Sequence, residues 1–449
     1  MPSLLSGTVN AIPSKSQAHR ALICAALADK ATFITCEGES EDIAATAGCL
    51  RALGAEIRRE RGGYAVLPMK QRTDGGATAA GQRVAVGAAA GQREAGSAAL
   101  AQRTDGGAVA LPCGESGSTL RFLLPIVAAL GQTAAFFPMG RLPQRPLSPM
   151  YEELLRHGCA LSPQGAVPFH VSGKLMPGRY AIDAGVSSQF ISGLLFALPL
   201  LDGDSELALT GRIESFPYIE LTVAMLEAFG IKADFDGATF ILQGGQSYRS
   251  PGTLLVEGDW SNAAFWLSAG AVGGSGVTCV GLDPLSRQGD RAILDILARF
   301  GAEVHSSADA VIVAGGALRG VEIDARDIPD LVPVLAVVAA AAEGTTLIRR
   351  AERLRDKESD RLFAITDVLG RLGADIRETE DGLAIRGGAA LAGGRVSSHG
   401  DHRIAMAAAV CAALCEAPLV IGGAEAVGKS YPGFFDDMRA LGGTALEVG

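Results

Sequence analysis

The sequence predicts an α/β protein built from six βαβαββ repeats, three in each of two domains. The first observation behind this is a glycine that follows an apolar helical run and precedes a short strand. It recurs at Gly54, Gly158, Gly230, Gly301, Gly373 and Gly442, with spacings of 104, 72, 71, 72 and 69 residues. Glycine suits the left-handed position that ends a helix. Each of these glycines is therefore predicted to end a helix.

The second observation is a Ser or Asp at a predicted helix start, because short polar side chains cap helix N-termini. These residues are Ser16, Ser118, Ser188, Ser261, Asp330 and Asp401, with spacings of 102, 70, 73, 69 and 71 residues. Two independent markers share a period of about 70 residues, which is long enough for one βαβαββ unit. The sequence therefore predicts six copies of one unit.

The first spacing is longer than the others because of the segment 71–108. It is rich in Ala and Gly, contains few large apolar residues and repeats Gln-Arg-Thr-Asp-Gly-Gly-Ala. Such a segment cannot bury enough apolar surface to order itself. We therefore predict a flexible insertion there, and a division into two domains near Gln243–Gln246, where the two parts become comparable in size.

Composition excludes several classes of protein. The 449-residue chain has a formal net charge of -10 and a pI near 5.2, which argues against nucleic acid as a partner. No stretch approaches the roughly 20 apolar residues that a membrane span needs. The eight cysteines form no Cys-x-x-Cys pair and are predicted to be buried thiols. We expect a cytoplasmic protein without a metal site or other cofactor, since no His/Cys/Asp cluster has metal-ligand spacing.

The helix starts carry most of the chemistry. A helix N-terminus presents free N–H groups and a partial positive charge, so it suits phosphate or carboxylate groups. The cations at or near these starts are Lys15, Arg20, Arg121, Arg145, Lys357, Arg361, Arg403 and Lys429. Few acids accompany them, chiefly Asp330 and Glu358, which would remain for proton transfer. The fourth start, Asp259–Asn262, adds no cation, which is consistent with a structural role.

These motifs together resemble a known family. The motifs are Ser14-Lys15-Ser16 with Arg20, Gln144-Arg145-Pro146, Ser187-Ser188-Gln189, Lys357-Glu358-Ser359-Asp360-Arg361 and Asp401-His402-Arg403. In combination they resemble the 5-enolpyruvylshikimate-3-phosphate synthases, over nearly the whole chain except the insertion. That family transfers an enolpyruvyl group from phosphoenolpyruvate to the 5-hydroxyl of shikimate 3-phosphate, releasing phosphate, in the pathway to chorismate and the aromatic amino acids.

The resemblance implies the two-domain enolpyruvyl-transferase fold, in which the domains close on small-molecule substrates. It implies an N-terminal domain of residues 13–244 and a C-terminal domain of residues 1–12 and 245–449. We also expect a monomer.

The resemblance also implies site residues. The shikimate 3-phosphate site would consist of Lys15, Ser16, Arg20, Ser187, Ser188, Gln189, Ser215, Tyr218, Asp330 and Lys357. The phosphoenolpyruvate site would consist of Lys15, Gly117, Arg145, Gln189, Arg361, Arg403 and Lys429. The implied catalytic residues are Asp330, Glu358, Lys15 and Lys429. Asp330 would accept the proton of the 5-hydroxyl, while Glu358 and one of the lysines would move a proton at the methylene carbon. Arg121 would play a supporting part.

Three places depart from the usual pattern of the family. Glu115-Ser116-Gly117-Ser118 stands where Asn-Ala-Gly-Thr is usual, and Phe122 stands where Pro is common. Arg353 stands where an Asn often contacts the shikimate phosphate, and it receives no role from the resemblance.

Three other interpretations compete. The related UDP-N-acetylglucosamine enolpyruvyl transferases share the six-unit fold, but use a Lys-Asn pair where this chain has Lys15-Ser16, and a loop cysteine as acid. Cys113 lies near that place, but its Leu-Pro-Cys-Gly setting favours a buried residue. The segment Gly423–Ser430 matches the phosphate-loop formula G-x-x-x-x-G-K-S, but Pro432 and the short remaining chain argue against a nucleotidase. A non-catalytic repeat scaffold would not need eight cations at its helix starts.

Overall fold

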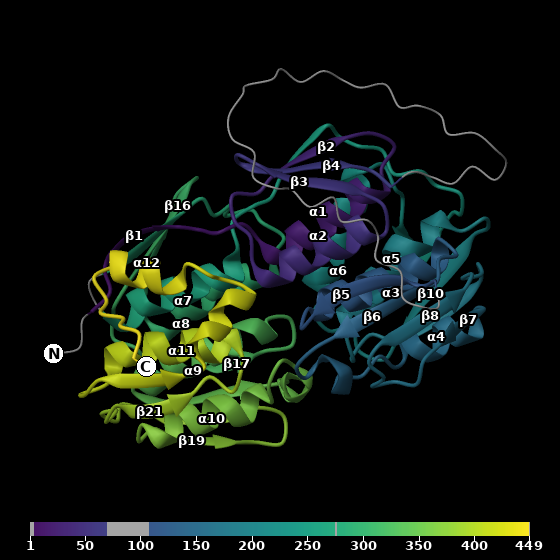
Figure 1. Ribbon diagram of the computed structural model, residues 1–449. Coiled ribbons are helices and arrows are strands. Elements are labelled where there is room, and N and C mark those ends of the chain that lie inside the picture. The colour runs from purple at the N-terminus through teal and green to yellow at the C-terminus, as the bar shows by residue number, and fades with distance from the viewer. Residues whose placement is uncertain (1–3, 70–106, 274–275, 449) are drawn as a thin grey trace.

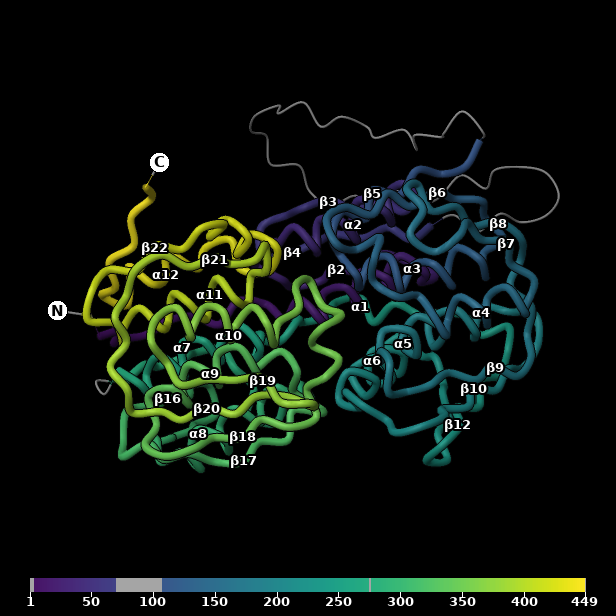
Figure 2. Tube along the Cα trace, turned by 90° about the horizontal axis from the view of Figure 1, so that it is seen from below, coloured from purple at the N-terminus to yellow at the C-terminus, as the bar shows by residue number. Residues whose placement is uncertain are grey.

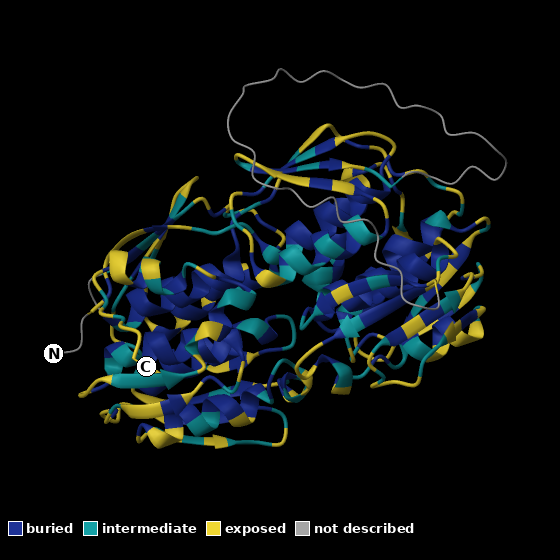
Figure 3. Cartoon of the chain, viewed as in Figure 1, coloured by how far each residue is buried: buried dark blue, intermediate teal, exposed yellow. Residues whose placement is uncertain are grey.

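Apolar helices form the centre of the molecule, and small sheets cover them from outside. The computed structural model describes residues 4–69, 107–273 and 276–448. Helix α9 (Val332–Ala341) shows why these helices are central, because its sequence VPVLAVVAAA has no polar face. A helix that is apolar all round must be surrounded by protein, and α9 is buried along nearly its whole length. Figure 3 shows the buried helices inside both parts of the molecule.

The helices follow the predicted period. The α-helices are α1 (Lys15–Leu27), α2 (Glu41–Ala52), α3 (Gly117–Ala129), α4 (Met150–Arg156), α5 (Ser188–Ala197), α6 (Phe216–Ala228), α7 (Trp260–Gly273), α8 (Ile293–Phe300), α9, α10 (Arg361–Arg371), α11 (His402–Cys411) and α12 (Phe434–Ala440). Short 3-10 helices are η1 (Leu142–Gln144), η2 (Leu198–Leu200), η3 (Gly289–Ala292), η4 (Pro329–Leu331), η5 (Glu352–Asp356), η6 (Ala412–Leu414) and η7 (Ala424–Lys429). Every predicted helix start lies within two residues of an observed one.

The predicted helix ends are also confirmed. All six repeat glycines have positive φ, between 74° and 108°, a backbone conformation that is strained for residues with a Cβ atom. Their recurrence therefore reflects six helices that stop in the same way.

Five sheets share one topology. The first strand of each runs parallel to the second, and a hairpin pairs antiparallel with the second strand. Their orders are β1-β14-β16-β15, β13-β2-β4-β3, β5-β6-β8-β7, β9-β10-β12-β11 and β17-β18-β20-β19. The strands of the first half are β1 (Gly7–Asn10), β2 (Thr32–Thr35), β3 (Glu56–Glu60), β4 (Gly63–Leu67), β5 (Val109–Gly114), β6 (Ala134–Pro138), β7 (Cys159–Leu161), β8 (Phe169–Gly173), β9 (Arg179–Asp183), β10 (Ser205–Thr210), β11 (Asp234–Phe235) and β12 (Thr239–Leu242). The later strands are β13 (Thr253–Leu255), β14 (Val277–Val280), β15 (Glu303–Ser306), β16 (Ala310–Ala314), β17 (Glu322–Asp324), β18 (Gly344–Arg349), β19 (Asp375–Glu378), β20 (Leu383–Gly387), β21 (Gly394–Ser397) and β22 (Leu419–Gly422).

The sixth unit differs from the predicted βαβαββ pattern. Its sheet contains only the parallel pair β21-β22, and among the described residues no hairpin follows α12. The sixth copy therefore keeps its two helices but not the outer hairpin of the other five.

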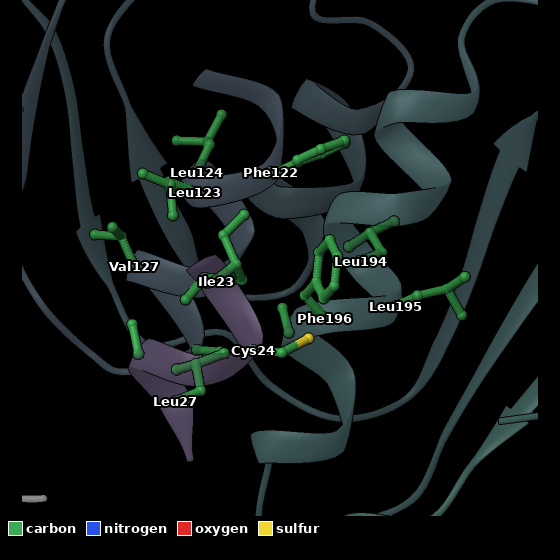
Figure 4. Packing of buried hydrophobic residues seen from close by; sticks show 14 of the residues in the cluster. Ile23, Cys24, Leu27, Phe122, Leu123, Leu124, Val127, Leu194, Leu195 and Phe196 are labelled. Carbon is green, nitrogen blue, oxygen red and sulfur yellow. The ribbon is translucent and has the colours of Figure 1, made fainter. Parts of the chain in front are cut away.

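The apolar core falls into two clusters, and each belongs to one lobe of the molecule (Figure 1). The first lobe takes its core residues from Ala18 to Val256, and the second takes Leu5, Val9 and residues from Trp260 to Leu441. Figure 4 shows how α1, α3 and α5 meet in the first lobe, with Ile23 lying between Val127 and Phe196. In the second lobe α7, α9 and α11 pack on one another in the same way.

Two strands are exchanged between the lobes. Strand β1 lies in a sheet of the second lobe, beside β14, whereas β13 lies in a sheet of the first lobe, beside β2. The chain therefore crosses between the lobes twice, and the two crossings are hydrogen-bonded to each other. Ser14 N donates to Glu257 O at 2.8 Å and Asp259 N donates to Ile12 O at 2.7 Å. Figure 2 shows the two lobes side by side with the chain passing between them.

Other sequence predictions have mixed outcomes. All eight cysteines are free and buried, as predicted.

The segment Gly423–Ser430 is mainly the 3-10 helix η7 rather than a phosphate loop leading into an α-helix, so its match to the formula is accidental. The predicted insertion at 71–108 lies almost wholly outside the described residues. Within the described part of the chain, no helix has the length and apolarity needed to cross a membrane.

Candidate active site

A small pocket lies between the two lobes and collects residues from all six helix starts. It encloses about 90 Å³. The helix-start residues that line it are Lys15 and Ser16, Gly117 and Ser118, Ser187 and Ser188, Ser261, Pro329 and Asp330, and His402 and Arg403. The sixfold repeat therefore points equivalent helix ends at one place.

Polar caps define several of these starts. Ser14 Oγ accepts from Gln17 N at 3.4 Å, Ser116 Oγ accepts from Thr119 N at 3.3 Å, and Asp401 Oδ1 accepts from Arg403 N at 2.9 Å. Caps satisfy some of the free N–H groups of a first turn, while the aligned peptide dipoles still favour an anion nearby. The pocket is therefore suited to negatively charged ligands even before its cations are considered.

Asp330 is surrounded by cations. Its Oδ1 accepts from Arg361 Nη1 at 2.7 Å, and its Oδ2 accepts from Arg403 Nη2 at 2.9 Å. Burial by itself would raise the pKa of Asp330, but Arg403, Arg361 and Lys357 outweigh burial and hold the pKa below its ordinary range. Asp330 is therefore an anion in the ligand-free protein.

Glu358 is the second carboxylate of the pocket. Its Oε2 lies 2.8 Å from Arg361 Nη2 and its Oε1 lies 3.5 Å from Arg145 Nη1. Although burial opposes ionisation, these two arginines lower the pKa of Glu358 well below its usual value. Because Arg145 comes from the first lobe and Glu358 from the second, this contact joins the lobes across the pocket.

Arg361 connects the acidic groups. It is almost completely buried and pairs with Asp401 at 2.8 Å as well as with Asp330 and Glu358. Such pairing is required of a buried cation, since an uncompensated charge in the interior is costly. Arg361 is thus fixed in orientation by three carboxylates from three different segments.

The two predicted catalytic lysines, Lys15 and Lys429, form ion pairs at different distances from the pocket. Lys15 Nζ lies 2.8 Å from Asp42 Oδ2 at the pocket wall. Lys429 does not line the pocket, because its Nζ contacts Glu115 Oε2 at 2.6 Å and Gly400 O at 2.8 Å. Lys429 is therefore the one predicted binding or catalytic residue that does not line the pocket, and it lies close to α11. All the others line the pocket.

Arg20 and Arg121 act mainly as scaffolding for other side chains. Arg20 donates to Thr222 Oγ1 at 2.8 Å and to the backbone oxygens of Ser16 and Tyr218 at 2.6 and 2.9 Å. Arg121 Nη1 donates to Gln189 Oε1 at 2.7 Å. Arg20 lines the pocket, whereas Arg121 lies behind it and orients Gln189.

Lys357 lines the pocket and has a strongly perturbed pKa. Burial lowers the pKa to about 7, and Arg353, Arg361 and Arg145 act in the same direction, while Asp330 opposes them. An anionic ligand would add its negative charge to that of Asp330 and so favour the ammonium form of Lys357.

Arg353 joins the lobes at the edge of the pocket. Its Nε lies 3.0 Å from Glu214 Oε2, and its Nη2 donates to Ser215 Oγ at 2.6 Å and to Arg326 O. Ser215 has a φ of 53°, which is unusual for a serine. Arg353 therefore holds a predicted ligand-binding residue in a strained turn.

Sequence reasoning missed several residues of the pocket. Asp42, Asp259, Ser261 and His402 line it although no role was predicted for them. The fourth helix start therefore contributes to the pocket wall although it supplies no cation, and Asp259 also accepts from Asn262 N at 2.8 Å at the start of α7. The signal was present in the repeat, since Ser261 occupies the same position in its unit as Ser16 and Ser188. Among the described residues, no group of three or more His, Cys, Asp or Glu side chains could hold a metal ion.

Comparisons with known proteins agree on one family. A family model described as EPSP synthase (3-phosphoshikimate 1-carboxyvinyltransferase) matches residues 1–91 and 90–438. The protein named 3-phosphoshikimate 1-carboxyvinyltransferase in Clostridium kluyveri is 43% identical over 444 residues, covering 98% of this chain and 96% of that protein. Its counterpart in Clostridium acetobutylicum is 40% identical over 449 residues, covering 99% of this chain and 97% of that protein.

Solved structures agree with the sequence relatives. EPSP synthase from Acinetobacter baumannii superimposes with a TM-score of 0.76 at 25% identity, covering 100% of this chain and 98% of that one. The enolpyruvyl transferase NikO from Streptomyces tendae has a TM-score of 0.71 at 18% identity, covering 98% and 95%, and supports the fold alone. With its fold, its pocket and its full-length relatives in agreement, the chain belongs to the EPSP synthase family.

Proposed function

We propose that this protein transfers the enolpyruvyl group of phosphoenolpyruvate to the 5-hydroxyl of shikimate 3-phosphate and releases phosphate. The observation that carries the proposal is the meeting of two carboxylates, Asp330 and Glu358, with cations from both lobes in one pocket. Two substrates that carry phosphate and carboxylate groups need such a concentration of positive charge, and addition to a double bond needs an acid and a base.

The substrates would occupy neighbouring parts of the pocket. Shikimate 3-phosphate would lie against the starts of α1 and α5, with Lys357 and Tyr218 at its other side. Phosphoenolpyruvate would lie between Gly117, Arg145, Arg361 and Arg403. Gln189 Nε2 donates to Ser118 Oγ, and Gln189 Oε1 accepts from Arg121 Nη1. These bonds support a shared wall, because they fix Gln189 between the two regions.

Binding of phosphoenolpyruvate would change the state of the base. In the free protein Arg361 and Arg403 neutralise Asp330, which makes its carboxylate a weak base. An anionic ligand that takes over part of this positive charge raises the pKa of Asp330. Asp330 can then accept the proton of the 5-hydroxyl group of shikimate 3-phosphate. At the same time the oxygen of that hydroxyl group attacks the substituted carbon of phosphoenolpyruvate.

The methylene carbon requires a separate proton donor. Because Glu358 is ionised in the free protein, it can donate only after an anionic ligand has drawn Arg361 and Arg145 away from it. Glu358, with Lys15 or Lys429, would then add a proton to this carbon and remove one again as the phosphate leaves. The proton count closes, since the proton that enters the methylene carbon in the addition step leaves it in the elimination step, and the hydroxyl proton held by Asp330 passes to the departing phosphate.

Substrate access requires the lobes to separate. The cavity of about 90 Å³ is far below the roughly 300–1,000 Å³ that ligand pockets usually offer. Contacts such as Arg145–Glu358 and Lys429–Glu115 fill the space between the lobes. Closure after binding would then exclude water from the reacting groups.

The domain organisation belongs to the same proposal. We assign residues 13–257 to one domain and residues 1–12 with 258–449 to the other. The boundary moves from 244 to about 257 because β13 pairs with β2 and because Tyr248 and Val256 lie in the core of the first lobe.

We further propose a monomer that works in the cytoplasm. One chain supplies both sides of the pocket, and its eight buried free thiols suit a reducing compartment. Light scattering of the purified protein tests the monomer.

The deciding experiment is a phosphate-release assay with phosphoenolpyruvate and shikimate 3-phosphate, run beside UDP-N-acetylglucosamine as acceptor. We expect release with the first acceptor only. Asp330→Asn and Glu358→Gln should each lower kcat by about 100-fold or more, which is the usual contribution of an acid or base. Asp295→Asn, at an exposed position in α8, is the matched control and should retain full activity. Release with the sugar nucleotide alone, or undiminished activity in both variants, would overturn the proposal.

A further inference from the structure

A buried carboxyl group lies directly behind the pocket, in the fourth unit. Asp290 belongs to η3 and is only 1% exposed. Its Oδ2 accepts from Tyr218 Oη at 3.1 Å and from Ser261 Oγ. Its Oδ1 is buried and has no hydrogen-bond partner among the described residues. An ionised carboxylate would leave that oxygen without the donors it needs in the interior.

Tyr218 connects this carboxyl group to the proposed base. Its hydroxyl oxygen lies 3.1 Å from Asp290 Oδ2 and 3.3 Å from Asp330 Oδ2. A phenol has one proton to donate. If both carboxyl groups are ionised, they compete for that proton, whereas a protonated Asp290 leaves it to Asp330.

The surroundings of Asp290 bring its titration into the neutral pH range. Burial and the nearby Asp330 raise the pKa of Asp290 to about 7, Asp259 acts in the same direction, and Arg403 and Ser261 oppose them. The groups that face Asp290 are thus Asp330 of η4, Arg403 of α11, Tyr218 of α6, and Asp259 and Ser261 at the start of α7. Only Arg403 among them is a cation, and it already pairs with Asp330.

We propose that Asp290 is a positioning residue for the enolpyruvyl transfer: when protonated, it directs the Tyr218 hydroxyl to Asp330. This proposal rests on the proposed function. Ionised Asp290 withdraws the hydrogen bond from the base and places a further negative charge next to the site of an anionic substrate. The enzyme therefore binds shikimate 3-phosphate productively only while Asp290 carries its proton.

A merely structural acid predicts something different. If Asp290 only held Ser261 and η3 together, replacing it by the isosteric Asn would change stability but not the pH dependence of catalysis. The pH profile therefore separates the two roles.

The test compares kcat/KM for shikimate 3-phosphate between pH 5.5 and 9 in the wild-type enzyme, Asp290→Asn and the control Asp295→Asn. The substrate phosphate titrates near pH 6 in every case, so the difference between the proteins carries the information. We expect kcat/KM to fall above neutral pH in the wild type and in Asp295→Asn. The fall from pH 6 to 8.5 should be at least about threefold smaller in Asp290→Asn, since the amide cannot ionise. Identical profiles would overturn the proposal.

Two further variants test the route through Tyr218. In a Tyr218→Phe background, Asp290→Asn should no longer change the pH profile, because non-additivity reports coupled residues. A change that persists in this background would show that Asp290 acts by charge alone and would overturn the positioning role. If Asp290→Asn does not fold, Ser261→Ala replaces it, and loss of that hydrogen bond should move the fall in kcat/KM to higher pH. An unmoved fall would count against the proposal.

Loss of the proposed function and loss of the Asp290 role give different experimental results. Absence of phosphate release by the wild-type enzyme would refute the proposed function. An active wild-type enzyme whose pH profile matches that of Asp290→Asn would refute only the role of Asp290.

Discussion

Side chains at the pocket are paired with carboxylates of the same chain before any substrate is present. Lys15 pairs with Asp42, Arg361 with three acids, and Lys429 with Glu115. Each pairing lowers the cost of keeping a charge in a nearly closed site. When a substrate binds, these cations therefore exchange a carboxylate of the protein for an anionic group of the substrate. The affinity for substrate depends on the free energy needed to break the internal ion pairs.

Gly117 sets the space available to Arg145. A Cβ atom at this position would lie 2.9 Å from Arg145 Nη1 and 3.2 Å from Arg121 Nη1, both at the ends of flexible side chains. Gly117→Ala should therefore fold, displace Arg145 and raise the KM for phosphoenolpyruvate by about tenfold, the effect of losing roughly 1.4 kcal/mol of binding. Steady-state kinetics with each substrate varied in turn will measure this.

Gly370→Ala is the control, because a Cβ atom there meets nothing within 4 Å and lies inside helix α10. It should leave both KM values unchanged. Equal effects of Gly117→Ala on the two substrates would contradict the assignment of Gly117 to the phosphoenolpyruvate region.

Lys357 should reduce the stability of the free protein at neutral pH. Its pKa is about 7 in the folded protein because burial disfavours the ammonium, against an ordinary value of 10.5 in the unfolded chain. Between these values the unfolded chain binds more protons, so the contribution of Lys357 to stability increases as the pH rises. Lys357→Met should raise the thermal midpoint by about 2–4 °C at pH 6–7, and the gain should shrink towards pH 10.

Thermal unfolding followed by calorimetry at several pH values tests this, with the exposed Lys232→Met as the control. A midpoint for Lys357→Met that lies below that of the wild type at pH 6 would contradict the prediction. The same variant should bind shikimate 3-phosphate poorly, because a site that favours its ligand often costs stability when empty.

At the scale of the element, the repeated helix ends are local devices with different surroundings. Gly54 and Gly301 have φ values of 108° and 103°. A Cβ atom at Gly54 meets nothing within 4 Å, whereas one at Gly301 would lie 2.6 Å from Ala317 O. The first position therefore needs glycine for its backbone conformation alone, and the second needs it for space as well.

This difference predicts unequal losses of stability. Gly54→Ala should cost about 1–2 kcal/mol, the strain of a left-handed residue with a Cβ atom, and Gly301→Ala should cost clearly more. Urea unfolding of the two variants, analysed by the change in midpoint, measures both values. Equal losses would show that the backbone around Ala317 moves away without cost.

At the scale of the whole molecule, the paired crossings define how the lobes can move. Segments 11–14 and 256–259 run side by side and are hydrogen-bonded, so the lobes are joined by one narrow two-stranded connection. Away from it, the interface at the pocket consists of ion pairs such as Arg145–Glu358 and Arg353–Glu214. Polar contacts of this kind hold two lobes together more weakly than a continuous apolar core does.

Opening of the lobes should therefore depend on salt and on substrates. Raising the ionic strength to about 0.5 M weakens the more exposed pair between the lobes, Lys429–Glu115, more than the buried pairs. The radius of gyration measured by X-ray scattering should therefore increase. Addition of shikimate 3-phosphate with phosphoenolpyruvate should reverse the increase. A radius that does not respond to either change would show that the closed arrangement is the resting state at any salt concentration.

The sequence by itself determined the helix starts, the helix ends and most of the pocket lining. Ser14, Asp401 and the six repeat glycines act on neighbouring residues of the chain, so their effect is visible in local sequence. Because the unit is repeated, the position of one helix start gives the positions of the others. Because these helix starts converge, the residues that line the pocket could be predicted from them.

Only the tertiary structure decided which side chains meet. Tyr218 contacts Asp290 and Asp330 across sequence separations of 72 and 112 residues, and Arg145 reaches Glu358 across 213. The local sequence likewise does not predict that β1 and β13 are exchanged between the lobes. Nor does it predict that the sixth unit, among the described residues, has no outer hairpin. Such contacts depend on how helices and lobes stack in space, and no short-range propensity encodes the partner of a side chain that lies hundreds of residues away.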